Sequence, residues 1–333
     1  MDKYIVGGKI YKNVLADVLL KIKYYLDSNK DCDIKDICDY GNELVKCKLN
    51  EVYKKSKKGM SLPFTISLNN CLGYFYDTVI LKESDIIKIE FGINIDDSIV
   101  NGCDTFVIKN NELSVSDPYI SFLDDMKTEV VKRILPKEII VDDALYEEGY
   151  ITTDDIRIMI ESKCTENDCF PVENCTSYQH NIELGLDKWS DSKRMILNYT
   201  KYYDESDRLI DINTCSEFEK GEVYTIDLTI IPNEFDSLPK IIMSTPGYIG
   251  RLNEYNYNLK LKSSRELYNK ISNEYNTNGF YIKEFDSPKE RMGRKECIDN
   301  GILDLYEVLY YNRNVYSKKF TIYVNKNKSL LFN

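Results

Sequence analysis

Apolar residues recur at helical spacing along the first fifty positions of the chain. Residues 8–26 place them three or four positions apart, at Ile10, Val14, Leu15, Val18, Leu19 and Ile22. Such a stripe predicts an amphipathic helix. A second helix is predicted over residues 33–53, whose acidic beginning suits the positive end of a helix dipole. Residues 116–150 and 152–164 also look mostly helical.

After the second helix the pattern changes to alternating and β-branched residues, which is typical of strands. The stretch "IKIEFGINIDDSIVNGCDTF" reads as a β-hairpin, with Glu90 on its first strand and Asp96-Asp97 at the turn. The return strand carries Asn101. A hairpin of this kind can aim polar side chains from both strands into one cavity, because residues two apart share a face of the sheet.

Two later stretches predict further strands, "EVYTIDLTII" at 222–231 and "KKFTIYVN" at 318–325. Because helices and strands recur in a similar order, we expect an α+β protein built from two related halves in a single domain, residues 1–333. The boundaries are expected at about 1–115 for the first half, about 116–333 for the second half, and about 186–220 for an irregular insertion.

Composition and charge limit the functions that this chain is expected to have. Its 333 residues are 43% hydrophobic and 30% charged, with a formal net charge of -11. An acidic chain is not generally attracted to nucleic acid, although a local basic patch can still bind it. No apolar run approaches the roughly 18 residues of a membrane span. The first residues lack the basic-then-apolar order of a secretory signal, so we expect an intracellular protein.

The ten cysteines form no C-x-x-C pair and no regular framework. In an intracellular chain, scattered thiols are usually reduced and packed as small apolar groups. The alternative is a zinc cluster at Cys164, Cys169 and Cys175. Zinc sites usually combine shorter spacings with a second pair of ligands, so buried thiols are the preferred interpretation.

Several stretches carry a resemblance to a known family. They are "KKGMSLPFTISLNNC", "IKIEFGINIDDSIVNGCDTFVI", "GEVYTIDLTI", "NLKLKSSRELY", "RMGRKECIDNGILDLYEVLY" and "KKFTIYV". Together they resemble the methionine aminopeptidase superfamily, and within it the proliferation-associated, ErbB-receptor-binding branch, which is usually regarded as non-catalytic. The resemblance implies the pita-bread (creatinase/aminopeptidase) fold, with two pseudo-symmetric halves.

The resemblance also implies where a metal site would lie. Active aminopeptidases of this fold hold two divalent ions with five side chains and bind substrate with a further histidine. Carried onto this sequence, the five ligand positions hold Glu90, Asn101, Tyr178, Asp227 and Lys319, and the substrate-histidine position holds Tyr74.

These residues are a poor set of metal ligands. Two divalent ions require several anionic oxygens and favour an imidazole nitrogen. Asn101 offers only a neutral carbonyl, and the ordinary pKa of a phenol such as that of Tyr178 is about 10. The ammonium of Lys319 has three donors and no acceptor. We therefore expect Lys319 to neutralise Glu90 and Asp227, with Asn101 and Tyr178 hydrogen-bonded around them, no metal and no catalytic residue.

His180 is the only histidine in the sequence. It follows Tyr178 by two residues, and a two-residue slip of a strand keeps a side chain on the same face. The alternative is therefore a residual single-metal aminopeptidase that uses Glu90, Asp227 and His180. No G-x-S-x-G elbow, catalytic-cysteine signature or phosphate-binding loop is present.

Three basic segments are candidates for contact with RNA. They comprise Lys54, Lys55, Lys57 and Lys58; Lys260, Lys262 and Arg265; and Arg291, Arg294 and Lys295. Such groups can neutralise phosphates, although a solvated helix face or loop is the simpler interpretation of each.

The resemblance implies a factor that docks on the large ribosomal subunit near the peptide tunnel exit, since similar proteins do so. Its expected partners there are rRNA and the proteins of the tunnel exit. Its role is expected in translation, in ribosome maturation or on idle ribosomes, with the nascent peptide as a further partner. A pre-60S biogenesis or export factor is the alternative. We expect no cofactor, no membrane and no DNA partner, and a location in the cytoplasm, with the nucleus and nucleolus as further compartments.

Overall fold

A computed structural model provides the structure of the chain. It describes residues 1–136, 152–173, 175–180, 193–198, 202–203, 209–210, 215–234, 238–253, 257–325 and 329–333. Within these residues no helix is both long and apolar enough to cross a membrane.

The two predicted N-terminal helices are confirmed as α1 (Asp2–Asp27) and α2 (Ile34–Glu51). The Asp33 side chain caps α2 by accepting the backbone N–H of Lys35. Both helices bury their apolar stripes in one core with the strands beneath them. Gly41 lets α2 approach closely, because a Cβ there would lie 2.6 Å from the ring of Phe64.

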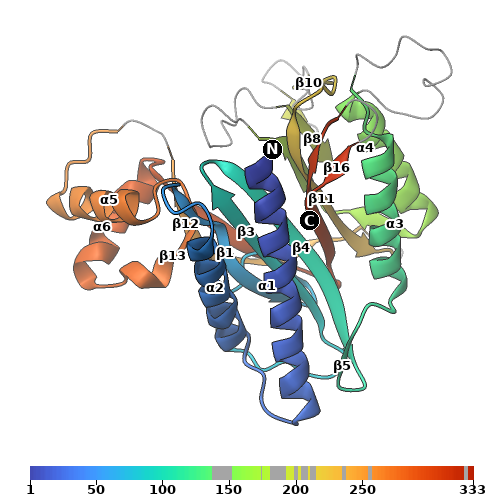
Figure 1. The fold of residues 1–333 in the computed structure, drawn as a ribbon, viewed down its shortest axis with the longest axis horizontal. Coiled ribbons are helices and arrows are strands. Elements are labelled where there is room, and N and C mark those ends of the chain that lie inside the picture. Colours follow the sequence, from blue (N-terminus) through green and yellow to red (C-terminus); the bar gives the residue numbers. More distant parts are fainter. Residues whose placement is uncertain are drawn as a thin grey trace.

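The main sheet is antiparallel throughout and joins the two halves of the chain (Figure 1). Its central path runs β1-β3-β4-β15-β11-β7-β8. These strands are β1 (Lys58–Leu68), β3 (Ile86–Ile95), β4 (Ser98–Lys109), β15 (Tyr316–Tyr323), β11 (Val223–Pro232), β7 (Cys175–Gln179) and β8 (Arg194–Leu197). Short strands β5 (Glu112–Ser114), β6 (Cys169–Pro171) and β16 (Leu330–Leu331) pair at its margins.

The predicted hairpin is confirmed as β3 and β4. Its turn residues Asp96 and Asp97 both have positive φ, 46° and 63°, as a two-residue hairpin turn of matching twist requires. In the resulting register Glu90 faces Cys103 and Gly92 faces Asn101. Glu90 and Asn101 therefore lie on the same face of the sheet.

Two further helices cover the second half of the main sheet, on the right in Figure 1. They are α3 (Pro118–Arg133) and α4 (Thr153–Glu166), and they share a core with β11 and β15. A capping box between Thr152 and Asp155 begins α4. The helical predictions hold over these spans, while residues 137–151 lie outside the described part of the chain.

A smaller sheet with two helices lies at the opposite end of the molecule (Figure 1). Its strand order is β13-β12-β14-β2, formed by β13 (Phe280–Tyr281), β12 (Ile241–Leu252), β14 (Leu303–Tyr311) and β2 (Cys71–Leu72). A 3-10 turn, η2 (Ile282–Phe285), follows β13. Helices α5 (Lys262–Glu274) and α6 (Pro288–Asp299) pack together where Gly293 lies against the backbone of Ser263.

The predicted insertion at about 186–220 lies largely outside the described residues. The short strands β9 (Tyr202–Tyr203) and β10 (Leu209–Ile210) pair with each other within it.

Candidate functional site

Four residues lie opposite one another across four neighbouring strands. Glu90 on β3 pairs with Cys103 on β4, Cys103 with Lys319 on β15, and Lys319 with Asp227 on β11. Directly opposed residues of an antiparallel sheet present their side chains on the same face. The register alone therefore aligns two carboxylates, a thiol and an amine in one row, with the amine between the acids.

Lys319 bridges the two carboxylates of this row. Its ammonium lies 2.8 Å from Glu90 Oε1 and 3.0 Å from Asp227 Oδ2. The side chains of Lys319 and Asp227 are each 14% exposed, and that of Glu90 is 8% exposed. Water therefore screens the ion pairs little. The ion pair expected from the sequence is present in the structure.

The electrostatic setting keeps Lys319 protonated. Burial alone lowers the pKa of Lys319, but attraction by Asp227 and Glu90 outweighs it and holds that pKa well above the ordinary lysine value. Burial raises the pKa of Glu90, a rise that the charge of Lys319 opposes and that of Asp227 reinforces. An amine that keeps its proton has no lone pair to offer a metal.

Tyr74, at the expected substrate-histidine position, covers the ammonium. Lys319 Nζ lies 5.6 Å from the centre of the Tyr74 ring, within the range of a cation–π contact. The backbone of Tyr74 has a positive φ of 56°, which costs a non-glycine residue energy and aims the ring into the site. Tyr306 packs against that ring at 4.7 Å between centroids.

Asn101 and Tyr178 are hydrogen-bonded to each other. The amide nitrogen of Asn101 donates to the Tyr178 hydroxyl over 3.0 Å, and its amide oxygen accepts the hydroxyl of Ser61 over 2.7 Å. Gly92 leaves room for this arrangement, because a Cβ there would lie about 2.0 Å from the Asn101 oxygen. Both residues line the same cavity as the ion pair, and they are hydrogen-bonded beside it as expected.

Hydroxyl groups that carry no signal of their own in the sequence hold Asp227 in place. Thr229 donates to Asp227 Oδ1 over 2.6 Å, and its oxygen lies 2.8 Å from the hydroxyl of Ser317. The backbone N–H of Asp227 donates to Ser177 over 2.9 Å. Thr229 and Ser317 lie two positions from Asp227 and Lys319 on β11 and β15, so the alternation of side chains places them on the same face of the sheet.

The ion pair forms part of the wall of a large cavity between the two sheets. The cavity has a volume of about 1120 Å³. Glu90, Asn101, Tyr178, Asp227, Lys319 and Tyr74 all line it, so the structure brings every predicted metal-site position to one place. Residues of β12 and β14, including Ile241 and Leu309, form the opposite wall.

His180 is held away from this cavity. Its Nε2 lies 2.7 Å from the Thr225 hydroxyl, and its ring stacks on Tyr178 at 5.6 Å. Burial lowers the pKa of His180 to about 3, so the ring is neutral at physiological pH. His180 is not one of the described residues that line the cavity. To act beside Glu90 and Asp227 it would have to leave its present position.

The residues present do not fit the pair of divalent ions that the fold implies. Lys319 lies within ion-pairing distance of both remaining acids and occupies the coordination space between them. In the described part of the chain, no three histidine, cysteine, aspartate or glutamate residues are grouped so that they could hold a metal.

The alternative zinc cluster receives no support from the described residues. Cys164, Cys169 and Cys175 are buried and free, as are most of the other cysteines. The thiol of Cys169 donates to the backbone carbonyl of Cys164 over 3.4 Å, and that of Cys175 to the carbonyl of Asp227 over 3.3 Å. These are the contacts of small core residues.

The basic loop divides into structural and exposed lysines. Lys58 donates to the carbonyls of Leu49 and Val52 over 2.8 and 2.7 Å and so closes the end of α2. Lys54, Lys55 and Lys57 are exposed. These three lysines remain candidates for RNA contact.

The other two basic segments lie on the helix pair α5–α6. Arg265 donates to the carbonyls of Leu259 and Lys260, and Arg294 to the carbonyl of Ile282 and to Asp286. The remaining charges, Lys260, Lys262, Arg291 and Lys295, are exposed.

The basic loop lies near the far end of α5. Gly59 approaches Asn278, and Gly279 donates its N–H to Ser61. A helix of 13 residues spans about 20 Å, so the loop and the segment that begins α5 are separated by roughly that distance.

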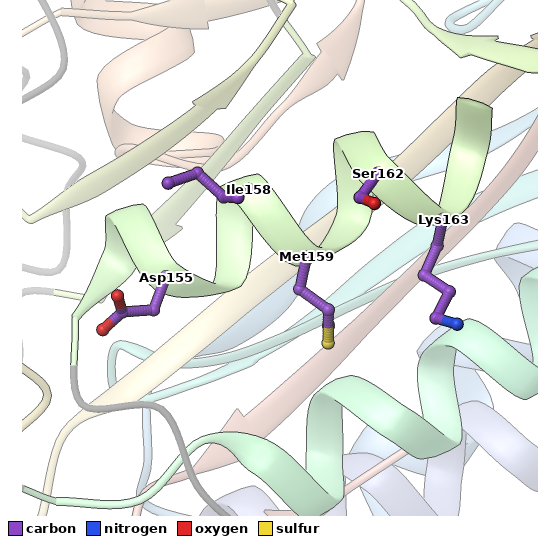
Figure 2. Close-up of a pocket in the computed structure, with 5 residues that line it drawn as sticks. All are labelled: Asp155, Ile158, Met159, Ser162 and Lys163. Atoms are coloured by element: carbon purple, nitrogen blue, oxygen red, sulfur yellow. The ribbon is translucent and has the colours of Figure 1, made fainter. Parts of the chain in front are cut away.

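Figure 2 shows a second, smaller cavity along α4, of about 300 Å³. Met159 and Lys163 point towards the neighbouring helix, while Ile158 points away from it. Asp155 belongs to the capping box of α4, and Lys163 pairs with Glu166 over 3.0 Å. The charged side chains of this cavity therefore stabilise α4 itself. For this reason the smaller cavity is a weaker candidate for a functional site than the central one.

Comparisons with solved structures identify the fold. The chain superposes on a thermophilic Arx1 with a TM-score of 0.76 and 22% identity, covering 100% of this chain and 90% of that one. Methionine aminopeptidase from Rickettsia prowazekii gives a TM-score of 0.53 at 14% identity, covering 99% and 95%. The chain has the pita-bread fold expected from the sequence.

Sequence comparisons place it more narrowly. No protein-family model matches the chain. It is 28% identical over 340 residues to ErbB-3 binding protein 1 of Arabidopsis thaliana, covering 99% of this chain and 79% of the relative. It is 26% identical over 319 residues to proliferation-associated protein A of Dictyostelium discoideum, covering 93% and 75%. Methionine aminopeptidase 2-1 of Fusarium vanettenii is 23% identical over 274 residues, covering 79% and 55%. The resemblance to the proliferation-associated branch is confirmed.

Proposed function

We propose that this chain is a non-catalytic, aminopeptidase-like factor that docks on the large ribosomal subunit near the peptide tunnel exit. The observation that carries the non-catalytic part is the position of Lys319. Its ammonium forms ion pairs of 2.8 and 3.0 Å with the two acids that remain at the metal-site positions. Metal-dependent hydrolysis needs an activated water on a Lewis acid, and a protonated amine supplies neither.

The ribosome-docking part rests on the relatives and on the exposed lysines. The chain resembles the proliferation-associated proteins over nearly its whole length. Exposed cations on the loop at Lys54, Lys55 and Lys57 and on α5–α6 are suited to phosphate contacts. The net charge of the chain, -11, disfavours RNA contact elsewhere on the protein, which favours one defined docking pose over general binding.

Sedimentation of source-cell extracts tests the docking. The chain should comigrate with 60S subunits and with 80S ribosomes. Comigration should weaken as salt rises, because the entropy gained by releasing counterions from the phosphates becomes smaller at higher salt. Migration only with pre-60S particles would favour the biogenesis alternative, and migration free of ribosomes would refute the proposal.

A metal and peptidase assay tests the loss of catalysis. The purified chain should neither take up Mn²⁺, Co²⁺ or Zn²⁺ stoichiometrically nor release methionine from a Met-initiated peptide. Stoichiometric metal together with turnover would instead establish the residual aminopeptidase that uses Glu90 and Asp227.

A further inference from the structure

An exposed tyrosine lies at the start of the basic loop. Tyr53 follows Glu51, the last residue of α2, by two positions and comes directly before Lys54 and Lys55. It is 36% exposed, and its side chain has no hydrogen bond to the described residues. Its φ is 41°, in the left-handed region, which costs a bulky residue energy. Backbone strain of this kind is common at binding sites, where it places one side chain for contact.

The loop around this ring is held in one shape. The N–H of Ser56 donates to the carbonyl of Tyr53 over 2.9 Å and closes a turn. Asp96, in the turn between β3 and β4, accepts the N–H of Lys57 over 2.7 Å and donates its own N–H to the carbonyl of Lys57 over 2.8 Å. A loop that is already ordered loses little conformational entropy when it binds a partner.

Negative groups beside the loop are neutralised within the protein. Lys58 donates to the last carbonyls of α2 and so offsets the negative end of the helix dipole. The carboxylate of Asp96 pairs with Lys3 over 2.8 Å, and that of Glu51 lies 3.9 Å from Lys48. The three exposed lysines of the loop, by contrast, form no ion pair with the described residues. Their charge is therefore available to an anionic partner.

A tyrosine ring next to unpaired lysines suits unpaired RNA. Lysines neutralise the phosphates of paired and unpaired strands alike. A base inside a duplex is already stacked on its neighbours, whereas an unpaired base can stack on an aromatic side chain. The ring of Tyr53 therefore adds a preference for unpaired strands that charge alone does not give.

We infer that the basic loop binds an unpaired stretch of RNA, with one base stacked on Tyr53 and the neighbouring phosphates held by Lys54, Lys55 and Lys57. That this RNA is ribosomal rests on the proposed function. The inference adds to that function the class of RNA, which is single-stranded, and a contact to a base. The phosphate contacts supply affinity, and the ring supplies the distinction between unpaired and paired RNA.

Fluorescence anisotropy with two defined RNAs tests the stacking contact. The first probe is a dye-labelled strand of about twelve uridines, within the usual range of site sizes, and the second is a dye-labelled RNA duplex of the same length. Tyr53→Leu should weaken binding of the uridine strand about fivefold or more, the effect expected for losing one base–aromatic stack. Binding of the duplex and the salt dependence of both probes should stay unchanged, because every lysine is still present.

Two variants control for other effects of the substitution. Tyr53→Phe keeps the ring and should bind both probes as the wild type does. Tyr24→Leu removes a tyrosine of α1 that is 52% exposed, with Lys21 Nζ and Lys30 Nζ at 6.0 and 5.1 Å from the centre of its ring. It should also bind both probes as the wild type does. Unchanged binding of the duplex by Tyr53→Leu shows that the loop remains folded.

Three results would overturn the inference. The first is equal binding of the uridine strand by the wild type and by Tyr53→Leu. The second is an equal loss of the uridine strand and the duplex in Tyr53→Leu, which would assign Tyr53 to the shape of the loop. The third is a loss of the same size in Tyr24→Leu, which would make the effect general to exposed tyrosines.

Sedimentation separates this inference from the proposed function. Tyr53→Leu should comigrate with ribosomes more weakly than the wild type, and Tyr53→Phe should comigrate as the wild type does. If the wild type does not comigrate but Tyr53→Leu still loses the uridine strand selectively, the ribosomal source fails with the proposed function and the stacking contact stands. If the wild type comigrates but Tyr53→Leu binds both probes unchanged, the inference fails alone.

Discussion

Lys318 and Lys319 are consecutive on β15, and each bridges a pair of carboxylates. The two pairs lie on opposite faces of the main sheet. Lys319 joins Glu90 to Asp227 on the cavity face. Lys318 joins Asp104 of β4 to Asp124 of α3, over 2.7 and 2.6 Å, on the other face. Two neighbouring amines thus tie β15 to three strands and a helix, at the place where the two halves of the chain meet.

Replacing Lys319 with methionine should destabilise the protein. The change leaves Glu90 and Asp227 buried beside each other without a cation, and breaking a buried ion pair from one side costs about 3–5 kcal/mol. The raised pKa of Lys319 means that its contribution is fully present below the ordinary lysine pKa of about 10.4 and is lost only as the pH rises through the higher folded value.

Chemical denaturation at pH 7 measures this loss, with Lys57→Met as an exposed control. The deficit should shrink as the pH falls and the two acids of the variant become protonated. An unchanged midpoint in Lys319→Met would show that the ion pair contributes nothing to the fold.

Replacing three cavity residues with metal ligands should create a metal site. The triple variant Asn101→Asp, Tyr178→His, Lys319→Glu replaces the amide, the phenol and the amine with oxygen and nitrogen ligands that suit divalent ions. Calorimetric titration with Mn²⁺ should show stoichiometric binding by this variant and none by the wild type. A triple variant that folds but takes up no Mn²⁺ would mean that the row of residues is not a former metal site.

Lys88 contributes to stability with a pH dependence opposite to that of Lys319. It is buried on β3, donates to the carbonyl of Asn69, and burial lowers its pKa to about 8. Between pH 8 and about 10.4 the unfolded chain binds more protons at this position than the folded chain, so stability from Lys88 rises with pH. Lys88→Met removes this dependence.

At pH 7 the Lys88→Met variant should therefore be more stable than the wild type. This advantage in the free energy of unfolding should shrink by about 2–3 kcal/mol by pH 10. Urea denaturation at the two pH values measures it. Lys54→Met, at an exposed lysine, should show no such change. A difference that is constant with pH would mean that Lys88 is not buried as a charged group.

The exposed lysines of the basic loop should contribute to ribosome binding. Replacing Lys54, Lys55 and Lys57 with glutamate should weaken comigration with ribosomes and flatten its dependence on salt. The slope of the logarithm of the binding constant against the logarithm of the salt concentration should become shallower by about 0.7–0.9 for each phosphate that the variant no longer neutralises. Lys58 is left in place because it closes α2.

The charge-matched control for this variant replaces Lys9, Lys12 and Lys23, which are exposed along α1, with glutamate. If both triple variants lost ribosome binding equally, the loss would be explained by net charge alone. Unaltered binding of the loop variant would remove the loop from the interface.

Much of the fold could be predicted because its elements have strong periodicity. The stripe from Ile10 to Ile22 and the hairpin around Asp96 follow from local pattern and turn chemistry. Helix α6 gave a weak signal, because only Gly293 and Cys297 of its residues are buried. The beginning of β12 is exposed, so it shows none of the alternation that marks a half-buried strand.

The site was predictable in composition but not in geometry. That an amine must neutralise Glu90 and Asp227 follows from chemistry once the positions are known. The place of Cys103 between Glu90 and Lys319 depends on the register of β4 against β15, which is set by long-range pairing. The ring of Tyr74 over the ammonium depends on a strained backbone that no local pattern indicates.

The row formed by Glu90, Cys103, Lys319 and Asp227 also bears on how many substitutions a metal site in this cavity would need. Changing the lysine to an acid by itself would crowd three like charges into one interior before any cation arrived to relieve them. That single change would therefore give a less stable molecule. A cation site in this cavity would need several of these side chains to change together.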